Sequence, residues 1–184
     1  MVKLQEEDAS LVHQMLVFLY SCGYDDAHPT QNPYEFNARM YALADKYGIV
    51  NLKDFAKYSL SLLLPYPGDL RTFKAPMFVK ALRVIYTTTL SSDRGLRDLV
   101  LPAIKCCRVD LRENVDFMEM LSSGLDDGGF VTDVFDALLE LAQPKTYQCT
   151  GCHVDTYPER FEKELYCWQC KDPAAFLVGP EFDP

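Results

Sequence analysis

Apolar side chains recur at helical spacing along most of the chain, between Asp8 and Pro144. The first segment follows Asp8, whose carboxylate can cap a helix. Its apolar positions predict one wide buried face. That face comprises Leu11, Val12, Met15, Leu16, Phe18 and Leu19. Before it, the short apolar run at residues 2–4 predicts a strand.

Two more helices are expected before the first proline-rich break. A loop with Asp25, Asp26, Pro29, Asn32 and Pro33 precedes them. Residues 36–47 form the second predicted helix, and Gly48 ends it. A third is predicted to be capped by Asn51 and ended by Pro65. The residues predicted to point inward from both helices are Met40, Leu43, Ala44, Tyr47, Leu52, Phe55, Ala56, Leu60 and Leu63.

The run of residues 65–68, Pro-Tyr-Pro-Gly, is the first credible boundary, and helical spacing resumes after it. Pro76 suits the first turn of a helix, and Ser92 or Asp93 can cap the next one, which Pro102 could kink. Two shorter helices follow, separated by Gly128 and Gly129. Their apolar residues are Val115, Phe117, Met118, Leu121, Val134, Phe135, Leu138, Leu139 and Leu141.

After Pro144 the sequence changes character. Residues 146–172 hold four cysteines and several aromatic residues but little helical periodicity, and residues 173–184 are predicted to form a flexible tail. The chain is therefore expected to be mainly α. Its predicted segments are 1–64, 70–143, 146–172 and 173–184.

The overall charge narrows the classes of partner. The chain has 18 Lys and Arg against 27 Asp and Glu, for a net charge of −9. Residues 143–184 hold four basic and seven acidic side chains, for −3. With no basic stripe, we expect no nucleic acid partner and no binding to anionic membranes. No apolar run reaches the ~18 residues that span a bilayer, and the first residues do not form a signal peptide. These features favour a cytoplasmic or nuclear location.

Four cysteines form two C-x-x-C pairs. The pairs are Cys149 with Cys152 and Cys167 with Cys170, and 14 residues separate them. Seven cysteines placed at random in this length would give roughly 0.23 such pairs. Four thiolates from two turns complete the tetrahedral set that a structural zinc ion requires. A segment this short cannot fold on a hydrophobic core alone and needs a crosslink, which a bound zinc ion supplies. We therefore expect one zinc ion per chain.

Other readings of these cysteines remain open. Disulfides would need an oxidising compartment, which no signal segment indicates. A thioredoxin-like redox pair would be preceded by a βαβ pattern, which the sequence lacks. Cys149 to His153 also spells C-x-x-C-H, a pattern typical of c-type haem attachment. The gap of 14 lies just below the 15–20 residues usual between zinc-binding pairs.

No catalytic constellation stands out. His13 and His28 have no acid or nucleophile at a spacing that indicates a dyad, and the common nucleophile and phosphate-loop motifs are absent. The carboxylate pairs at 25–26 and 126–127 lie in predicted turns, which favour Asp. Residues 93–98 are interpreted as a solvated, charged helix face. Cys22 is expected at the end of the first helix, and the neighbours Cys106 and Cys107 are interpreted as small buried apolar residues. We therefore expect no enzyme.

The first helical segments resemble a known family. Residues 11–20, 24–26 and 40–49, with Leu52, Lys53 and Ala56, resemble the C-terminal half of a BTB/POZ domain of the filamentous-fungal type. The resemblance covers residues 2–60. Residues 73–121, which include Val84–Tyr86, Ser92–Arg94, Leu96–Leu99 and Phe117, resemble the helical extension that follows the domain in those proteins. The four-cysteine end is similar to a feature of some of them.

The resemblance implies a non-catalytic scaffold or adaptor. It implies protein partners, among them cullin-type ubiquitin ligases and other BTB proteins. The β-hairpin, interface helices and first helical pair that the resemblance implies are expected to have no counterpart here, so the family's homodimer interface and part of its cullin surface are expected to be missing. A divergent half-domain and an incomplete chain both explain this. In the second case, the first helices would expose sticky apolar faces.

The expected fold is thus a truncated BTB/POZ-like helical half (1–64), a helical extension (70–143) and a zinc-ribbon or zinc-knuckle module (146–172). The expected function is protein–protein interaction. A zinc-ribbon protein of transcription is one alternative, although it would need basic residues on the ribbon. A redox protein that uses Cys149 and Cys152 is another.

Overall fold

A computed structural model describes the helical part of the chain almost continuously and the C-terminal part in short pieces. The described residues are 8–26, 31–65, 73–125, 129–142, 147–149, 151, 153, 155–156 and 177–178. The fold is mainly helical, as the sequence predicts. The chain divides into two compact units, residues 1–138 and 139–184, and each is described here by itself.

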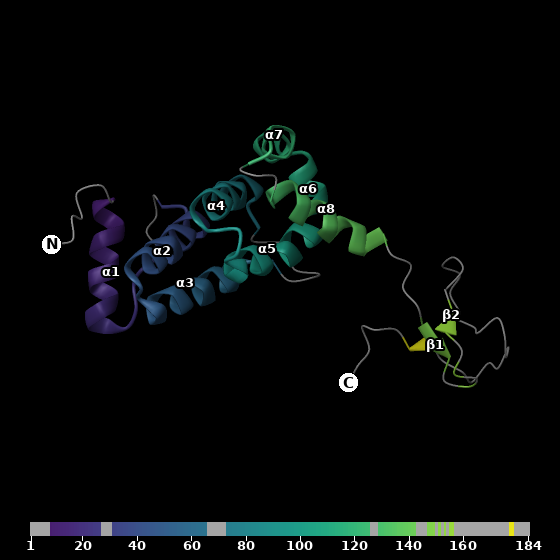
Figure 1. Cartoon of the computed structure of the whole chain (residues 1–184), viewed down its shortest axis with the longest axis horizontal. Helices are drawn as coiled ribbons and strands as arrows, with labels where there is room; N and C mark the ends of the chain where they lie inside the picture. The colour runs from purple at the N-terminus through teal and green to yellow at the C-terminus, as the bar shows by residue number, and fades with distance from the viewer. Residues whose placement is uncertain are drawn as a thin grey trace. The chain divides into compact units, whose positions relative to one another are not determined.

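Eight helices and three short strands make up the described elements (Figure 1). The helices are α1 (Ala9–Ser21), α2 (Pro33–Tyr47), α3 (Val50–Leu63), α4 (Ala75–Thr88), α5 (Arg94–Cys106), α6 (Arg108–Arg112), α7 (Val115–Ser123) and α8 (Gly129–Ala142). The strands are β1 (Tyr147–Cys149), β2 (Asp155–Thr156) and β3 (Leu177–Val178). Within the described residues, no helix combines the length and the apolar composition needed to cross a bilayer.

Several helix ends follow the sequence signals. The Asp8 carboxylate accepts a hydrogen bond from the Ser10 amide, and Asp93 does the same for Gly95. Gly48 ends α2 with φ at 66°, a left-handed conformation that glycine adopts without steric cost. Pro76 lies in the first turn of α4. The helix α5 continues through Pro102 to Cys106.

Two predicted helix starts were wrong. The second helix begins at Pro33, not at residue 36, because the Asn32 side chain caps it and proline suits its first position. The third begins at Val50, and Asn51 lies inside it. Its N-cap residue is Ile49, which makes no side-chain capping bond. The short α6 has no counterpart among the predicted elements.

The helix α1 buries a narrower face than predicted. Leu11, Met15 and Phe18 are buried, whereas Leu16 is 44% exposed and Leu19 is 52% exposed. The buried positions face α2, which α1 packs against. With little else packed against α1 in the described part of the chain, its second row of leucines stays in solvent.

The core of the helical unit runs through α2, α3, α4 and the helices that follow. Helix α2 packs against both α3 and α4 (Figure 1). Edge-to-face aromatic pairs extend across the interfaces: Tyr34 with Phe78 joins α2 to α4, and Tyr86 with Phe130 joins α4 to α8 at a ring separation of 4.9 Å. Leu52, Ala56 and Leu60 are completely buried, as their spacing predicts. Other completely buried side chains are Met40, Leu82, Ile85, Leu96 and Leu111.

The C-terminal unit contains a three-stranded antiparallel sheet with the order β2-β1-β3. Tyr147 pairs with Thr156 and Gln148 with Asp155, and on the other edge Cys149 pairs with Leu177. The segment predicted as a flexible tail therefore contributes a strand. Its backbone groups satisfy the open edge of β1, which hydropathy along the sequence does not reveal.

Candidate functional site

The sequence places the candidate metal site in the C-terminal unit, and the structure describes one part of its backbone. Cys149 is the last residue of β1. The side chain of Cys149 and the residues Cys152, Cys167 and Cys170 lie outside the described residues. Among the side chains that are described, no group of three or more His, Cys, Asp or Glu residues could hold a metal ion. The zinc site therefore stays a prediction.

The described backbone places Cys149 at the end of β1, directly before the connection to β2. Because β1 and β2 pair in an antiparallel register, residues 150–154 join two adjacent strands. Gly151 lies in a turn and is exposed. His153, which follows Cys152, has φ at 56°, in the left-handed region that non-glycine residues adopt uncommonly. A tight turn at the end of a strand is the backbone setting in which two cysteines three residues apart can share one metal ion.

The three other cysteines occupy different environments. Cys107 is completely buried between α5 and α6, as predicted for a small apolar residue, and burial raises the pKa of its thiol to about 12. Cys106 is partly buried beside it. Cys22 ends α1 as predicted: it is the C-cap residue, has a left-handed conformation and is exposed. The buried Cys107 thiol is too weakly acidic to act as a nucleophile.

The histidines and paired carboxylates do not form one site among the described residues. His13 is exposed on α1, and His28 and the carboxylates at 126–127 lie outside the described part. Asp26 accepts a hydrogen bond of 2.7 Å from the Asn37 amide nitrogen, and the Tyr24 hydroxyl donates to the Asn37 oxygen. Asn37 is completely buried, and it also donates to the Pro33 carbonyl. This group fastens the loop after α1 to α2.

A second polar group, centred on Asp93, joins three helices. The Tyr41 hydroxyl of α2 donates to Asp93 Oδ1 at 2.9 Å. The Lys53 ammonium of α3 donates to Asp93 Oδ2 at 2.7 Å and to Asp45 at 2.6 Å. Asp93 also accepts from the Gly95 amide at the start of α5. Lys53 lies 4.8 Å from the centre of the Tyr41 ring, which adds a cation–π contact.

These contacts shift the ionisation of each partner. Burial, followed by the hydrogen bond to the Asp93 carboxylate, raises the pKa of Tyr41 to about 12. Burial opposes ionisation of Asp93, but hydrogen bonds from Lys53, the Gly95 amide and Tyr41 outweigh it and lower its pKa. For Lys53, burial is likewise outweighed by the hydrogen bonds to Asp45 and Asp93, so its pKa is raised. Each group is thus held in its ordinary charge state at neutral pH.

Gly95 makes the close approach of Tyr41 to α5 possible. A Cβ atom built on Gly95 would overlap the Tyr41 hydroxyl oxygen and crowd the Asp93 carboxylate. The absence of a side chain therefore matters for packing and not for backbone conformation. Neither Gly95 nor Tyr41 carries a recognisable signal of this role in the sequence, since the two are distant along the chain.

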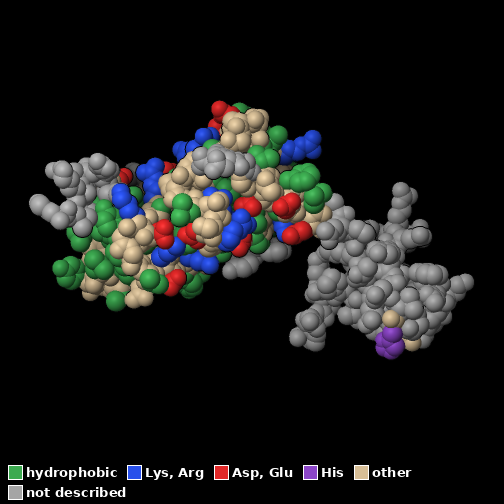
Figure 2. All heavy atoms as spheres, viewed as in Figure 1, with side chains coloured by type: hydrophobic (Ala, Val, Ile, Leu, Met, Phe, Trp, Pro, Cys, Tyr) green, Lys and Arg blue, Asp and Glu red, His purple; other side chains and the backbone are tan. Residues whose placement is uncertain are grey.

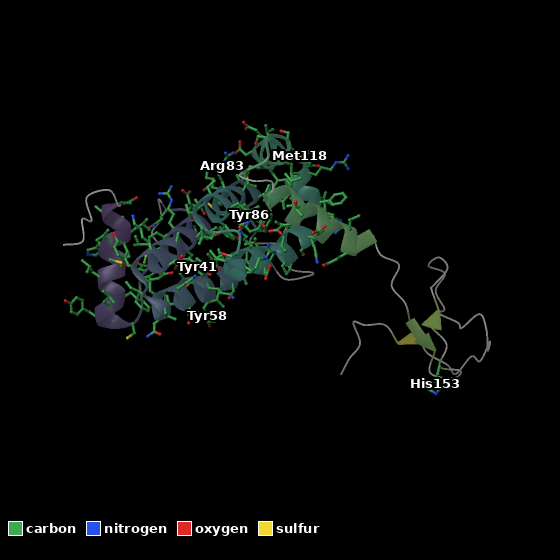
Figure 3. The ribbon with its side chains drawn as sticks, in the orientation of Figure 1. Tyr41, Tyr58, Arg83, Tyr86, Met118 and His153 are labelled. Carbon is green, nitrogen blue, oxygen red and sulfur yellow. The ribbon has the colours of Figure 1, made fainter. Side chains whose placement is uncertain are left out.

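A third polar group, centred on Asp133, joins α8 to α4 and to the start of α5. Asp133 of α8 accepts hydrogen bonds from the Tyr86 hydroxyl at 2.8 Å and from Arg94 at 2.9 Å. Arg97 is buried, stacks 4.6 Å from the Tyr86 ring centre and donates to the Thr89 carbonyl. The interpretation of residues 93–98 as a solvated face was therefore wrong for Asp93 and Arg97. Figure 3 labels Tyr41 and Tyr86, the hydroxyl donors of the two groups.

Two hollows mark the surface of the helical unit. One, of about 450 Å³, lies between α1 and α2 and is lined mainly by polar side chains that include Asp8, Glu35 and Arg39. Arg39 pairs there with Glu35 at 2.6 Å. The other, of about 620 Å³, is bounded by α5, α6, α7 and α8 and is mainly apolar. Sequence reasoning found neither hollow, because each depends on how two or more helices pack together.

The described groups are suited to holding helices together. The tyrosine hydroxyls of both clusters donate to carboxylates that cations also neutralise. Among the described residues, these clusters place no hydroxyl or thiol beside a histidine base, which nucleophilic catalysis of the serine or cysteine type requires. The arrangement therefore supports a stable helical platform.

Replacing Gly95 by alanine is expected to destabilise the protein. Helix propensity alone predicts a gain of about 0.5–1 kcal/mol for Gly→Ala in a helix. The overlap with Tyr41 reverses that sign, and we expect a loss of about 1–3 kcal/mol in the free energy of unfolding. Urea unfolding followed by circular dichroism measures it. In the background of Tyr41→Phe, the same Gly95→Ala change should cost less; an equal cost in both backgrounds would show that the hydroxyl is not responsible.

Replacing Asp93 by asparagine keeps a capping side chain but removes the charge that Lys53 and Tyr41 contact. We expect a loss of about 1.5–3 kcal/mol at pH 7. Because the folded pKa lies below the unfolded value of about 3.9, this contribution is complete well above pH 4. It should shrink as the pH falls below about 4, so wild type and variant converge. Asp98→Asn, which removes an exposed partner of Arg94, is the control and should cost less than about 0.5 kcal/mol. Equal losses for the two variants at pH 7 would contradict the assignment.

The comparisons with known proteins add no relative to this picture. No protein-family model, curated protein or solved structure matches the chain. Function therefore has to be argued from the surfaces and the chemistry of the chain itself.

Proposed function

We propose that this chain is a non-catalytic protein-interaction protein, a BTB-type scaffold or adaptor with a structural zinc ion in its C-terminal unit. The observation that carries the proposal is the outward face of α1. Leu16, Leu19 and Tyr20 lie at helical spacing, and Tyr20 is 91% exposed. Figure 2 shows hydrophobic side chains gathered at this end of the helical unit. Contiguous exposed apolar surface is typical of a site that another protein covers.

The packing of α1 supports an interface rather than an unfinished core. Leu11, Met15 and Phe18 already fill the contact with the rest of the unit, and the Phe18 ring lies 5.4 Å from Phe55. The leucines that remain in solvent are therefore an additional row. A large aromatic residue beside two leucines is also the composition found at the centre of protein interfaces.

The resemblance to the C-terminal half of a BTB/POZ domain supports the class of partner. Its motifs include residues 11–20, so the resemblance and the exposed face coincide on α1. Cullin-type ubiquitin ligases and other BTB proteins are the partners that this resemblance suggests. This support is a sequence analogy. It is strengthened because the similar residues include the exposed face of α1.

Zinc is proposed on the chemistry of the donor set. Cys149, Cys152, Cys167 and Cys170 would supply four thiolates, the set typical of closed structural zinc sites. The hairpin between β1 and β2 is a backbone setting suited to the first pair. When bound, the ion would crosslink the C-terminal unit, and with four protein ligands it would leave no position open for a substrate.

The zinc proposal predicts one zinc ion per chain in protein purified without chelators. Elemental analysis of the wild type measures it directly. The double variant Cys149→Ser, Cys152→Ser should lose the metal, because two ligands are too few to hold it tightly. The variant Cys22→Ser, which changes an exposed cysteine of the helical unit, is the control and should keep one zinc ion. Wild-type protein without zinc would overturn this part of the proposal.

The interaction proposal predicts that charge on the α1 face abolishes partner binding. The variant Leu19→Glu, Tyr20→Glu should weaken binding at least about tenfold, which is ~1.4 kcal/mol. Its matched control is Tyr58→Glu, Leu62→Glu, the same substitutions at exposed positions on α3 (Figure 3 labels Tyr58). Affinity capture from cell extract identifies the partner, and biolayer interferometry with that purified partner, a cullin N-terminal region among the candidates, gives the affinities.

Three outcomes of this experiment are informative. Loss of a defined partner with the α1 variant alone supports the proposal. Loss of the partner with the Cys149→Ser, Cys152→Ser variant alone would move the contact to the C-terminal unit and overturn the role of α1. Capture of chaperones alone, by every form, would mean that the exposed face is an unpaired part of an incomplete domain, and the adaptor function would be dropped.

A further inference from the structure

The apolar groove at the other end of the helical unit is a second surface, separate from α1. Its floor consists of Ile104, Leu111, Phe117, Leu121 and Val134. All of its lining residues lie within the first compact unit, so its shape does not depend on the position of the second. Its volume of about 620 Å³ is within the roughly 300–1,000 Å³ of ligand sites.

Apolar side chains also stand at the rim of this groove. Val109 on α6 is 64% exposed, and Met118 on α7 is 45% exposed (Figure 3 labels Met118). Leu138 continues the wall on α8. A small molecule would be held by the floor alone and would leave these rims in water. An elongated occupant covers both the floor and the rims, which is why the groove fits a macromolecular segment better.

The walls also decide which kind of segment fits. The groove is bounded by helices α5 to α8, which offer no strand edge to pair with an extended peptide. An amphipathic helix satisfies its own backbone hydrogen bonds and binds such a groove with apolar side chains at positions i, i+3 or i+4, and i+7. Met118 on the rim adds a flexible side chain that adapts to different anchors.

The charged residues on the rim indicate which charge the partner helix carries. Arg108 and Arg112 line the groove from α6, and among the described lining residues Glu113 is the acidic one. The described lining residues therefore hold one more basic than acidic side chain, on a chain whose net charge is −9. Acidic residues beside the apolar anchors of a partner helix would pair with these guanidinium groups, and a basic helix would be repelled by them.

We propose that the groove between α5, α6, α7 and α8 binds an amphipathic helix of a partner protein, with acidic residues flanking its apolar anchors. Leu121, Met118 and Leu138 contact the anchors, and Arg108 and Arg112 select the acidic flanks. The surface is distinct from the α1 face, so either surface can fail its test without affecting the other.

The test uses the full-length chain and two synthetic helical peptides of about 16 residues, each with leucine anchors at i, i+4 and i+7. One peptide has flanking glutamates, and the other has lysines at the same positions. Fluorescence anisotropy gives both affinities. We expect the acidic peptide to bind at least about tenfold more tightly than the basic one, and to weaken as salt is added.

Three variants locate the site. The double variant Arg108→Glu, Arg112→Glu should weaken the acidic peptide at least about tenfold and improve the basic one. Its matched control, Lys80→Glu, Arg83→Glu on α4, makes the same change in net charge at exposed positions outside the groove and should leave the ratio near the wild-type value. Met118→Glu should weaken both peptides, since it places a charge on an apolar rim. Circular dichroism confirms that each variant is folded.

Clear outcomes overturn the proposal. One is the absence of saturable binding of the acidic peptide at about 0.5 mM, which corresponds to an affinity too weak for a specific site. Another is an equal effect of the α6 variant and the α4 control, which would show that net charge alone is responsible. Self-association of the chain in sedimentation, abolished by Met118→Glu, would assign the groove to a second copy instead.

Discussion

The arrangement of the helical unit depends on one carboxylate that three helices share. Asp93 begins α5, accepts the Tyr41 hydroxyl from α2 and pairs with Lys53 from α3. Hydrogen bonds to a charged group that is partly withdrawn from water are stronger than neutral ones and restrict geometry more. They fix where α5 starts relative to the pair formed by α2 and α3. Since α6 follows α5 directly, the position of the apolar groove follows from this same contact.

The start of α5 is also held by a second carboxylate, Asp133. Asp133 accepts hydrogen bonds from the Tyr86 hydroxyl and from Arg94, and these bonds hold α8 to α4 and to the first turn of α5. The aromatic contacts of Phe130 with Tyr86 and Phe117 fill the space below. Polar contacts set the register of these helices, and apolar burial supplies the stability. Helices fixed in this way do not rearrange to bury the apolar side chains that remain in solvent.

The two proposed surfaces consist of apolar side chains that the packed helices leave exposed. On α1, a row of leucines and a tyrosine lies outside the contact with α2. At α6 to α8, the helices meet without fully covering Leu121 and Leu138, and Arg108 and Arg112 stand at the edge. The two surfaces differ in chemistry, since one is purely apolar and the other combines an apolar floor with a basic rim. A scaffold that joins two different partners would have surfaces of this kind.

The sequence by itself determined the elements that depend on local signals. Helical spacing of apolar residues located the principal helices, and capping residues such as Asp8, Gly48 and Asp93 located several of their ends, because these effects act within a few residues. The cysteine spacing predicts zinc for the same reason, since ligands in a C-x-x-C turn are local. The apolar faces that become covered are known only from the tertiary structure: Leu16 and Leu19 match the pattern of buried residues, yet in the described part of the chain they stay 44% and 52% exposed. It also decided that Asp93 and Arg97 are partners of distant side chains, and that Gly95 makes room for Tyr41, because contacts between residues far apart in the chain leave no trace in spacing.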